Sequence, residues 1–204
     1  MTQGFFSRIW HFIWDEDSAW SWIVNVILAF LVIKFILYPA LGFLLGTSVP
    51  IVAVVSGSME HTGNLGAYWA NPICCDQTCA HKEIPRDYYN RINITEQDFR
   101  HFDFANGFNK GDIMILANIK NVEKGEVIVY LTNRPDPIIH RVINITSEKD
   151  NTVFKTKGDN NCESGDFEQQ IPSRNVLGKA VWRIPFLGWV KILAVELLGL
   201  IWRQ

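Results

Sequence analysis

The feature that most constrains this sequence is a long apolar run from Trp20 to Leu45. Its main interruptions are Ser21, Asn25, Lys34, Pro39 and Gly42. A helix rises about 1.5 Å per residue, so a helix of this length crosses a hydrocarbon core of ~30 Å even when tilted or kinked at the proline. The run is too long for the apolar core of a cleaved signal, and no small-residue cleavage site follows it promptly. We therefore predict a retained membrane anchor over residues 20–46, preceded by a cytoplasmic segment at 1–19.

Lys34 is the one charged residue inside this run. A lysine at the centre of a membrane helix costs roughly 2.5–3.5 kcal/mol on insertion scales. Two alternatives follow from that cost. Either Lys34 faces a polar partner inside a complex, or the span lies off-centre and the side chain reaches an interface.

The composition indicates one folded domain of ordinary size beside the anchor. The chain has 204 residues, of which 20% are charged and 48% are hydrophobic, so it is neither disordered nor uniformly embedded in lipid. Its formal net charge is −2, and the basic residues are spread along the sequence. This pattern argues against nucleic acid as a partner.

Tryptophans and glycosylation sequons give the expected location. Most tryptophans gather near the two ends of the chain, at Trp10, Trp14, Trp20, Trp22, Trp182, Trp189 and Trp202. Such clustering suits a membrane–water interface, with ordinary core packing as the alternative. Two sequons, Asn93-Ile94-Thr95 and Asn144-Ile145-Thr146, both follow the anchor. We therefore expect a cell-membrane protein whose body lies on the extracytoplasmic side.

The body after the anchor reads as mainly β. Apolar, β-branched runs recur between turn-rich separators, which predicts short strands at 51–55, 113–117, 127–131, 138–145, 153–156 and 176–184. Short strands at this spacing favour an antiparallel β fold. We assign this body to residues 47–184.

Two segments differ from that pattern. Residues 62–108 are polar, contain three of the four cysteines and lack clear periodicity, so we expect an insertion or lid that is partly helical near 96–102. The tail, residues 185–204, is apolar but carries Lys191 and Glu196. It is a second span, a re-entrant piece or an interfacial helix.

Three short motifs carry candidate chemistry. Ser56-Gly57-Ser58 follows the anchor, His140 lies in an apolar strand, and Asp159 lies in a Gly-Asp-Asn turn. A serine hydroxyl needs a base within hydrogen-bond reach, a histidine suits that role, and a carboxylate orients the imidazole. Taken singly, each motif is more often structural: a loop, a core histidine and a turn.

The motifs together resemble type I signal peptidase, specifically its archaeal and endoplasmic-reticulum branch. The resemblance rests on residues 50–60, 109–114, 139–142, 156–161 and 176–188, in the order of the family. It implies a signal-peptidase-like fold and a membrane-bound endopeptidase that cuts signal peptides from preproteins after small residues. The implied partners are those preproteins, the lipid bilayer and the secretion translocon or accessory subunits. No cofactor and no metal are implied.

The resemblance also implies roles for particular residues. Ser58 is the expected nucleophile and His140 the base, where the bacterial branch has lysine. Ser56 Oγ and the Ser58 N–H are expected to bind the oxyanion. The family has two aspartates after the histidine. Asp159 matches the first and Asp166 the second. Asp166 is the expected triad acid and Asp159 the supporting residue, with Asp159 as the alternative triad acid, because the loop before Asp166 is one residue longer than usual. The chain also departs from the family at His61, where many members have proline.

The four cysteines are Cys74, Cys75, Cys79 and Cys162. In an extracytoplasmic body they favour disulfides, and Cys162 would then tie the insertion to the loop after Asp159. A zinc site that uses His81 and free thiols are the alternatives. Two other functions also remain open. They are a non-catalytic membrane subunit that only binds apolar helices, and a metal-binding module centred on the cysteines.

Overall fold

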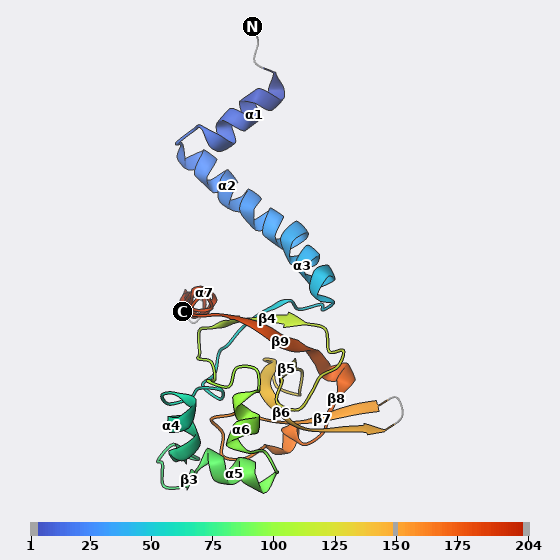
Figure 1. Ribbon diagram of the computed structural model, residues 1–204. Helices are drawn as coiled ribbons and strands as arrows, with labels where there is room; N and C mark the ends of the chain where they lie inside the picture. The colour runs from blue at the N-terminus through green and yellow to red at the C-terminus, as the bar shows by residue number, and fades with distance from the viewer. Residues whose placement is uncertain (1–3, 149–150, 202–204) are drawn as a thin grey trace. The chain divides into compact units, whose positions relative to one another are not determined.

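The computed structural model describes residues 4–148 and 151–201. The chain divides into two compact units, the first ending at Leu44 and the second beginning at Leu45. Figure 1 traces both units from the N-terminus to the C-terminus. Each unit is described by itself.

The first unit is helical. It comprises α1 (Phe5–Trp14), α2 (Ala19–Val32), a π-helical turn η1 (Ile33–Leu37) and α3 (Tyr38–Leu45). From Ala19 to Leu45 the helix is continuous over 27 residues, with a mean hydropathy of 2.3, which meets the length and composition of a membrane span. Two polar interruptions of the run bond to the end of α1, since Ser21 Oγ donates to Phe12 O and Asn25 Nδ2 donates to Ile13 O.

The π-helical turn has a cause in the sequence. Pro39 has no N–H to donate to the carbonyl of Phe35, and its ring would clash with that carbonyl in a regular helix. Widening of the preceding turn relieves the clash, as at other helix distortions. Lys34 lies in this turn, with Nζ 5.6 Å from the centre of the Phe30 ring and 5.5 Å from that of Phe35. The charge is thus held against two aromatic faces.

The second unit is built on a seven-stranded antiparallel sheet, as the strand pattern predicts. The strands follow the order β1-β4-β9-β5-β6-β7-β8. They are β1 (Ile51–Ala53), β4 (Ile113–Ala117), β5 (Val127–Tyr130), β6 (Ile138–Glu148), β7 (Asn151–Lys157), β8 (Ile171–Pro172) and β9 (Val176–Ile184). The core between them includes Val54, Met59, Met114, Leu116 and Val129.

Each of the six expected strands is present, and β8 is an additional short strand that was not expected. β6 runs three residues beyond its expected end, and β7 begins two residues before its expected start. β4 and β9 begin and end at the expected residues. β1 ends at Ala53, two residues early. Val54 still bonds to the segment before β4, since its N–H donates to Asp112 O at 2.9 Å and its carbonyl accepts from the Gly111 N–H at 2.8 Å. Val55 is then half exposed. The chain therefore turns away from the sheet just before Ser56.

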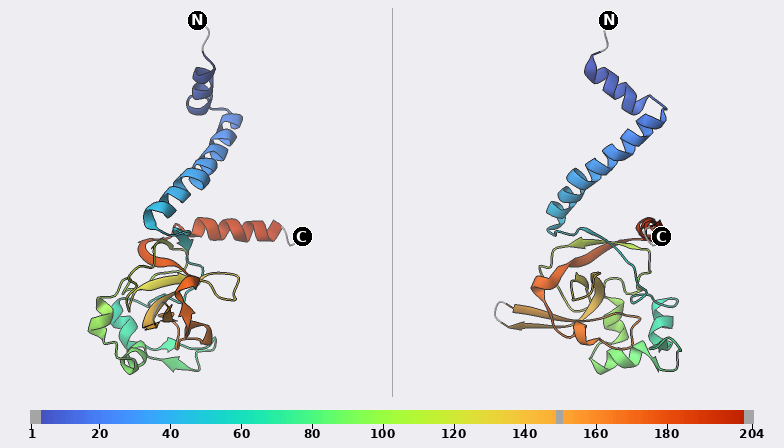
Figure 2. Two further views of the ribbon diagram at one scale, coloured as in Figure 1. Left: turned by 90° about the vertical axis from the view of Figure 1, so that its right-hand side faces the viewer. Right: turned by 180° about the vertical axis from the view of Figure 1, so that it is seen from behind.

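The insertion forms a small helical layer on the sheet. Its elements are α4 (Leu65–Ala70), β2 (Ile73–Cys74), β3 (Lys82–Glu83), α5 (Pro85–Arg91) and α6 (Glu96–Arg100). α6 matches the expected helical stretch, whereas α4 and α5 were not expected. Tyr68, Trp69, Tyr89 and Phe99 form an aromatic cluster that includes Ile143 of β6. The helices gather at the end of the body remote from α7 (Figure 2).

The cysteines form two disulfides. Cys74 pairs with Cys79 within the insertion, and Cys75 pairs with Cys162 in the loop after β7. The second bridge ties the insertion to the loop that follows Asp159, as expected. The zinc and free-thiol alternatives are therefore wrong, because each sulfur is bonded to another sulfur.

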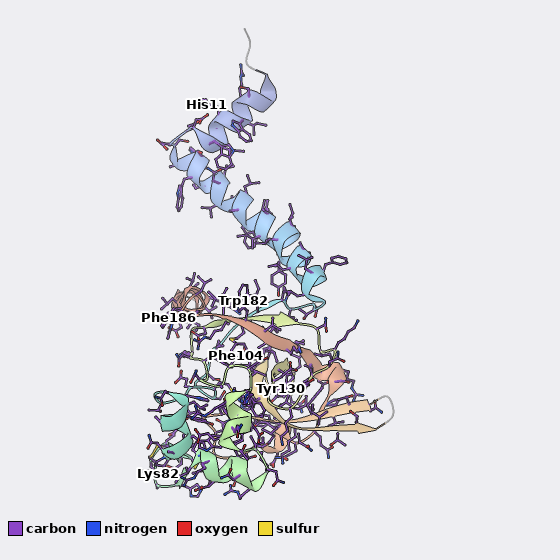
Figure 3. The ribbon with its side chains drawn as sticks, viewed as in Figure 1. His11, Lys82, Phe104, Tyr130, Trp182 and Phe186 are labelled. Carbon is purple, nitrogen blue, oxygen red and sulfur yellow. A yellow bond between two sulfur atoms is a disulfide. The ribbon has the colours of Figure 1, made fainter. Side chains whose placement is uncertain are left out.

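The tail forms α7 (Trp189–Ile201). The described helix has 13 residues and rises about 20 Å, less than the ~30 Å of a hydrocarbon core. Its start is anchored at Gly111, whose φ is +90° and where a Cβ would lie 2.0 Å from Trp189 Nε1. Trp182 and Phe186 are exposed near this anchor, whereas Tyr130 is buried in the sheet (Figure 3).

Candidate active site

Ser58 lies in a tight loop just after β1. The next residue, Met59, is fully buried in the core, and its carbonyl accepts from the Phe108 N–H at 3.1 Å. The Glu60 N–H closes the loop on Gly57 O at 3.1 Å. The buried methionine therefore fixes the backbone while the Ser58 side chain faces a cavity.

His140 lies on β6, opposite Ile128 of β5. Its ring is buried, and Nε2 is 2.9 Å from Ser58 Oγ. Nδ1 contacts Glu168 Oε1. Hydrogen bonds thus link the serine hydroxyl to the histidine ring, and the histidine ring to a carboxylate. In this arrangement the histidine can remove the hydroxyl proton of the serine.

Glu168 is held rigidly behind the histidine. It ends a short 3-10 turn, η2 (Asp166–Glu168), and its side chain is buried. Oε2 accepts from the Gly165 N–H at 2.8 Å, and Oε1 also accepts from Thr156 Oγ1 at 3.3 Å. These bonds leave Oε1 directed at His140.

The position of Asp166 differs from the expectation. Asp166 begins the same turn but is exposed, and the carboxylate against His140 belongs to Glu168 instead. A 3-10 helix has about three residues per turn, so side chains two positions apart point in different directions. The turn η2 therefore places Glu168, rather than Asp166, on the buried side.

Asp159 lies close to the site but not against His140. Its carboxylate accepts from Arg141 at 2.7 Å from Nη2 and 2.9 Å from Nε, and both side chains are fully buried. Burial alone would raise the pKa of Asp159, but the Arg141 guanidinium and the hydrogen bond from His61 outweigh it and hold that pKa well below its usual range. The Asp159 carboxylate is therefore paired with Arg141 and His61 rather than with His140.

The remaining N–H groups of the Arg141 guanidinium donate to backbone carbonyls. They donate to the carbonyls of Asp103, Phe104 and Gly125 at 2.7–3.0 Å. A fully buried charged group is stable only when its hydrogen-bond donors all have partners, as they do here. The guanidinium therefore connects β6, the end of the insertion and the Asp159 turn.

We expect Arg141→Met to lower the free energy of unfolding by about 3–5 kcal/mol, because it leaves the Asp159 charge buried without its partner. Denaturant unfolding of the purified variant measures this loss. Arg86→Met is the control, since Arg86 and Asp87 form an exposed pair, and such pairs contribute about 0–1 kcal/mol. Equal, small losses in both variants would contradict the prediction.

Ser56 lies beside the expected nucleophile. Its hydroxyl is exposed and is 3.2 Å from Ser58 Oγ. The two hydroxyls therefore face the same space, where an oxygen of a bound carbonyl would need donors.

This space is a cavity of about 830 Å³. Its walls come from the end of β1, the start of β6, the β5–β6 loop and the disulfide-bonded loop of the insertion. Arg134 lies over the ring of Phe167 at 4.4 Å and helps to form one wall. The cavity is large enough for several residues of an extended peptide.

Comparison with known proteins gives related sequences, although no family model matches the chain. A signal peptidase complex catalytic subunit of Fusarium vanettenii is 36% identical over 99 residues, which is 44% of this chain and 57% of the relative. A human catalytic subunit of the same complex is 35% identical over 96 residues, 42% of this chain and 50% of the relative.

A bacterial relative matches a shorter stretch. Signal peptidase I W of Bacillus subtilis is 36% identical over 58 residues, 27% of this chain and 30% of the relative. The chain thus spans about half the length of the eukaryotic relatives it matches. Over part of its length the chain is therefore similar both to catalytic subunits of the eukaryotic signal peptidase complex and to a bacterial signal peptidase I.

Proposed function

We propose that this chain is a membrane-bound serine endopeptidase that removes N-terminal signal peptides from preproteins. One observation carries the proposal: Ser58 Oγ lies 2.9 Å from His140 Nε2, whose other ring nitrogen contacts the buried Glu168. The names of the relatives support the same activity.

In this mechanism Ser58 attacks the scissile carbonyl while His140 takes its proton. Glu168 holds the imidazole in the tautomer that leaves Nε2 free to accept, and it stabilises the imidazolium that forms. His140 then protonates the leaving amine. Water, activated by the same histidine, releases the acyl group from Ser58.

The developing oxyanion needs donors that are already in place. The Ser58 N–H and the Ser56 hydroxyl are the proposed donors, since Ser56 Oγ lies 3.2 Å from Ser58 Oγ. A single donor of this kind contributes about 10²–10³-fold in kcat.

The substrate would bind as an extended strand. β1 is the first strand of the sheet and pairs only with β4 among the described residues, so its other edge is free for a peptide. Ala53 of β1 and Ile139 of β6 both line the cavity. Backbone pairing tolerates varied sequence, and small side chains before the cut would fit beside these apolar walls.

The proposed location is the extracytoplasmic side of the cell membrane. The two disulfides favour an oxidising compartment, and both sequon asparagines, Asn93 and Asn144, are exposed. The apolar surface around Phe186 and α7 would contact the bilayer. Accessory subunits are proposed partners because the eukaryotic relatives are subunits of a complex. The secretion translocon is a further proposed partner.

The test is cleavage of a signal-bearing precursor by purified full-length protein in detergent and in liposomes. We expect one cut after a small residue, identified by mass spectrometry of the new N-terminus. The matched substrate carries a bulky residue before the cut and should not be cleaved. Failure to cleave in both preparations would favour a non-catalytic membrane subunit.

A further inference from the structure

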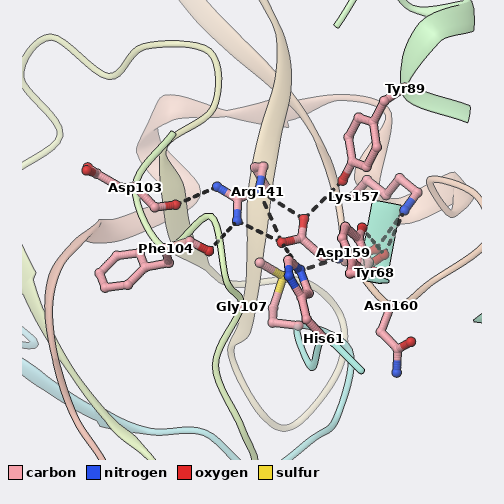
Figure 4. A network of polar contacts seen from close by, with 12 residues as sticks. His61, Tyr68, Tyr89, Asp103, Phe104, Gly107, Arg141, Lys157, Asp159 and Asn160 are labelled. Carbon is pink, nitrogen blue, oxygen red and sulfur yellow. Dashed lines mark hydrogen bonds and ion pairs between the residues drawn. The ribbon is translucent and has the colours of Figure 1, made fainter. Parts of the chain in front are cut away.

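The buried carboxylate of Asp159 has more partners than an ion pair with Arg141 requires. Two tyrosines of the insertion and His61 also bond to this residue (Figure 4). We call Arg141, Asp159, His61, Tyr68 and Tyr89 the Asp159 cluster. All five side chains are buried.

The insertion supplies two hydroxyl donors to this cluster. Tyr89 of α5 donates to Asp159 Oδ1 at 3.0 Å, and Tyr68 of α4 donates to the Asp159 carbonyl at 2.8 Å. Burial and the nearby Asp159 charge raise the pKa of both tyrosines, so both hydroxyls keep the protons that they donate. The insertion therefore reaches the Gly-Asp-Asn turn directly.

His61 completes the cluster from the serine loop. Nε2 is 2.9 Å from Asp159 Oδ2, and the ring stacks on Tyr68 with centroids 3.6 Å apart and planes 2° apart. Nδ1 is buried with no partner among the described residues. This arrangement fits the tautomer with its proton on Nε2, which donates to Asp159.

The backbone around Asp159 in turn contacts the catalytic groups. The Asn160 N–H donates to Ser58 O at 2.8 Å, and Asn160 Nδ2 donates to Gly57 O at 3.1 Å. A Cβ at Gly158 would lie 2.8 Å from His140 Nε2 and 2.9 Å from Ser58 O. A displacement of this turn would therefore move Ser58 relative to His140.

We propose that Tyr68, Tyr89 and His61 are positioning residues for the catalytic serine and histidine. They fix Asp159, and the turn at Asp159 fixes the Ser58 backbone against His140. The insertion thus acts as a part of the catalytic framework, built against the site by helices α4 and α5. This inference rests on the proposed function for its kinetic consequence, but its geometric consequence is measurable without turnover.

The tests are Tyr89→Phe and Tyr68→Phe, which remove one hydroxyl each and keep the ring. The acceptor of Tyr89 is a charged carboxylate, so loss of the hydroxyl weakens the hold on Asp159, and we expect Tyr89→Phe to lower kcat about tenfold. We expect KM to stay within about twofold, because these residues act on the reacting groups and not on substrate binding. For Tyr68→Phe, whose acceptor is a neutral carbonyl, we expect a smaller fall in kcat.

His61 allows a conservative rescue. His61→Leu removes the donor to Asp159 and should lower kcat as Tyr89→Phe does. His61→Gln retains an N–H and should recover most of the loss. Tyr88→Phe is the matched control, since Tyr88 lies beside Tyr89 on α5 and its hydroxyl is not a partner of Asp159 among the described residues. Thermal unfolding of each variant identifies any that fail to fold.

A second readout needs no substrate. With ¹⁵N-labelled histidine, we expect the ring signals of His140 to shift in Tyr89→Phe and not in Tyr88→Phe. Unchanged His140 signals and unchanged kcat in Tyr89→Phe and in His61→Leu would overturn the inference. If the wild-type protein cleaves no precursor, the proposed function fails, and the His140 signals alone decide whether the cluster positions the histidine.

Discussion

Replacement of Ser58 by alanine is expected to abolish precursor cleavage, with a fall in kcat of about 10⁶-fold. The reason is geometric, since Ser58 Oγ is the hydroxyl within 2.9 Å of His140 Nε2. His140→Ala should cause a loss of the same size, because serine and histidine act as one unit. The double variant should then be no slower than either single one.

The measurement is single-turnover cleavage of a labelled precursor, followed over hours to detect residual rates. Ser147→Ala is the control, because Ser147 is exposed near the end of β6 and should leave kcat unchanged. Continued cleavage by Ser58→Ala at a wild-type rate would exclude Ser58 as the nucleophile. Ser56 would then be the next candidate, because its hydroxyl faces the same cavity.

The sheet was predictable because its strands have strong local signals. β4 and β9 combine β-branched residues with turn-rich flanks, so their bounds can be read from the sequence. The short helices α4 and α5 lack such a signal. They have six and seven residues, too few to show a clear apolar periodicity in the sequence. Such short helices depend on tertiary packing, which the shared aromatic cluster provides, and the disulfides hold the same segment in place.

The serine and the histidine of the site could be predicted from short sequence motifs, but the carboxylate could not, because its position depends on how a loop folds. The expected residues Ser58 and His140 lie together in the structure because each has a fixed place relative to a strand. The carboxylate lies in the loop after Asp159, where the resemblance to the family points to Asp166 and the fold of the loop decides which side chain is buried. Glu168 is the next acidic residue after Asp166 in the same loop, so the sequence does offer it as a candidate for the carboxylate.

The hydrogen-bond partners of Asp159 could not be predicted from the sequence. Tyr68 and Tyr89 are separated from Asp159 by 91 and 70 positions, and only tertiary folding joins them. In the sequence, His61 stands out only as a departure from the family that the chain resembles, and nothing in the sequence gives it a role. Its buried contact with Asp159 gives that departure a physical meaning, since proline could not donate a hydrogen bond there.

Glu168→Gln is expected to lower kcat by about 10⁴-fold, whereas Asp166→Asn should change it by less than about twofold. A glutamine amide that donates to Nδ1 of His140 would leave the proton on Nε2. That nitrogen could then no longer accept the proton of Ser58. Asp166 is exposed, and the carboxylate against His140 is that of Glu168, so the charge of Asp166 has little part in this step.

Both variants keep the size of the original side chain, which separates the loss of charge from the loss of packing. Glu168→Asp should retain part of the activity, because the carboxylate remains but is set back by one methylene. Cleavage rates are compared at a fixed pH after denaturant unfolding has shown that each variant is folded. The opposite pattern, with Asp166→Asn inactive and Glu168→Gln active, would assign the acid to Asp166 and would require the loop after Asp159 to refold when substrate binds.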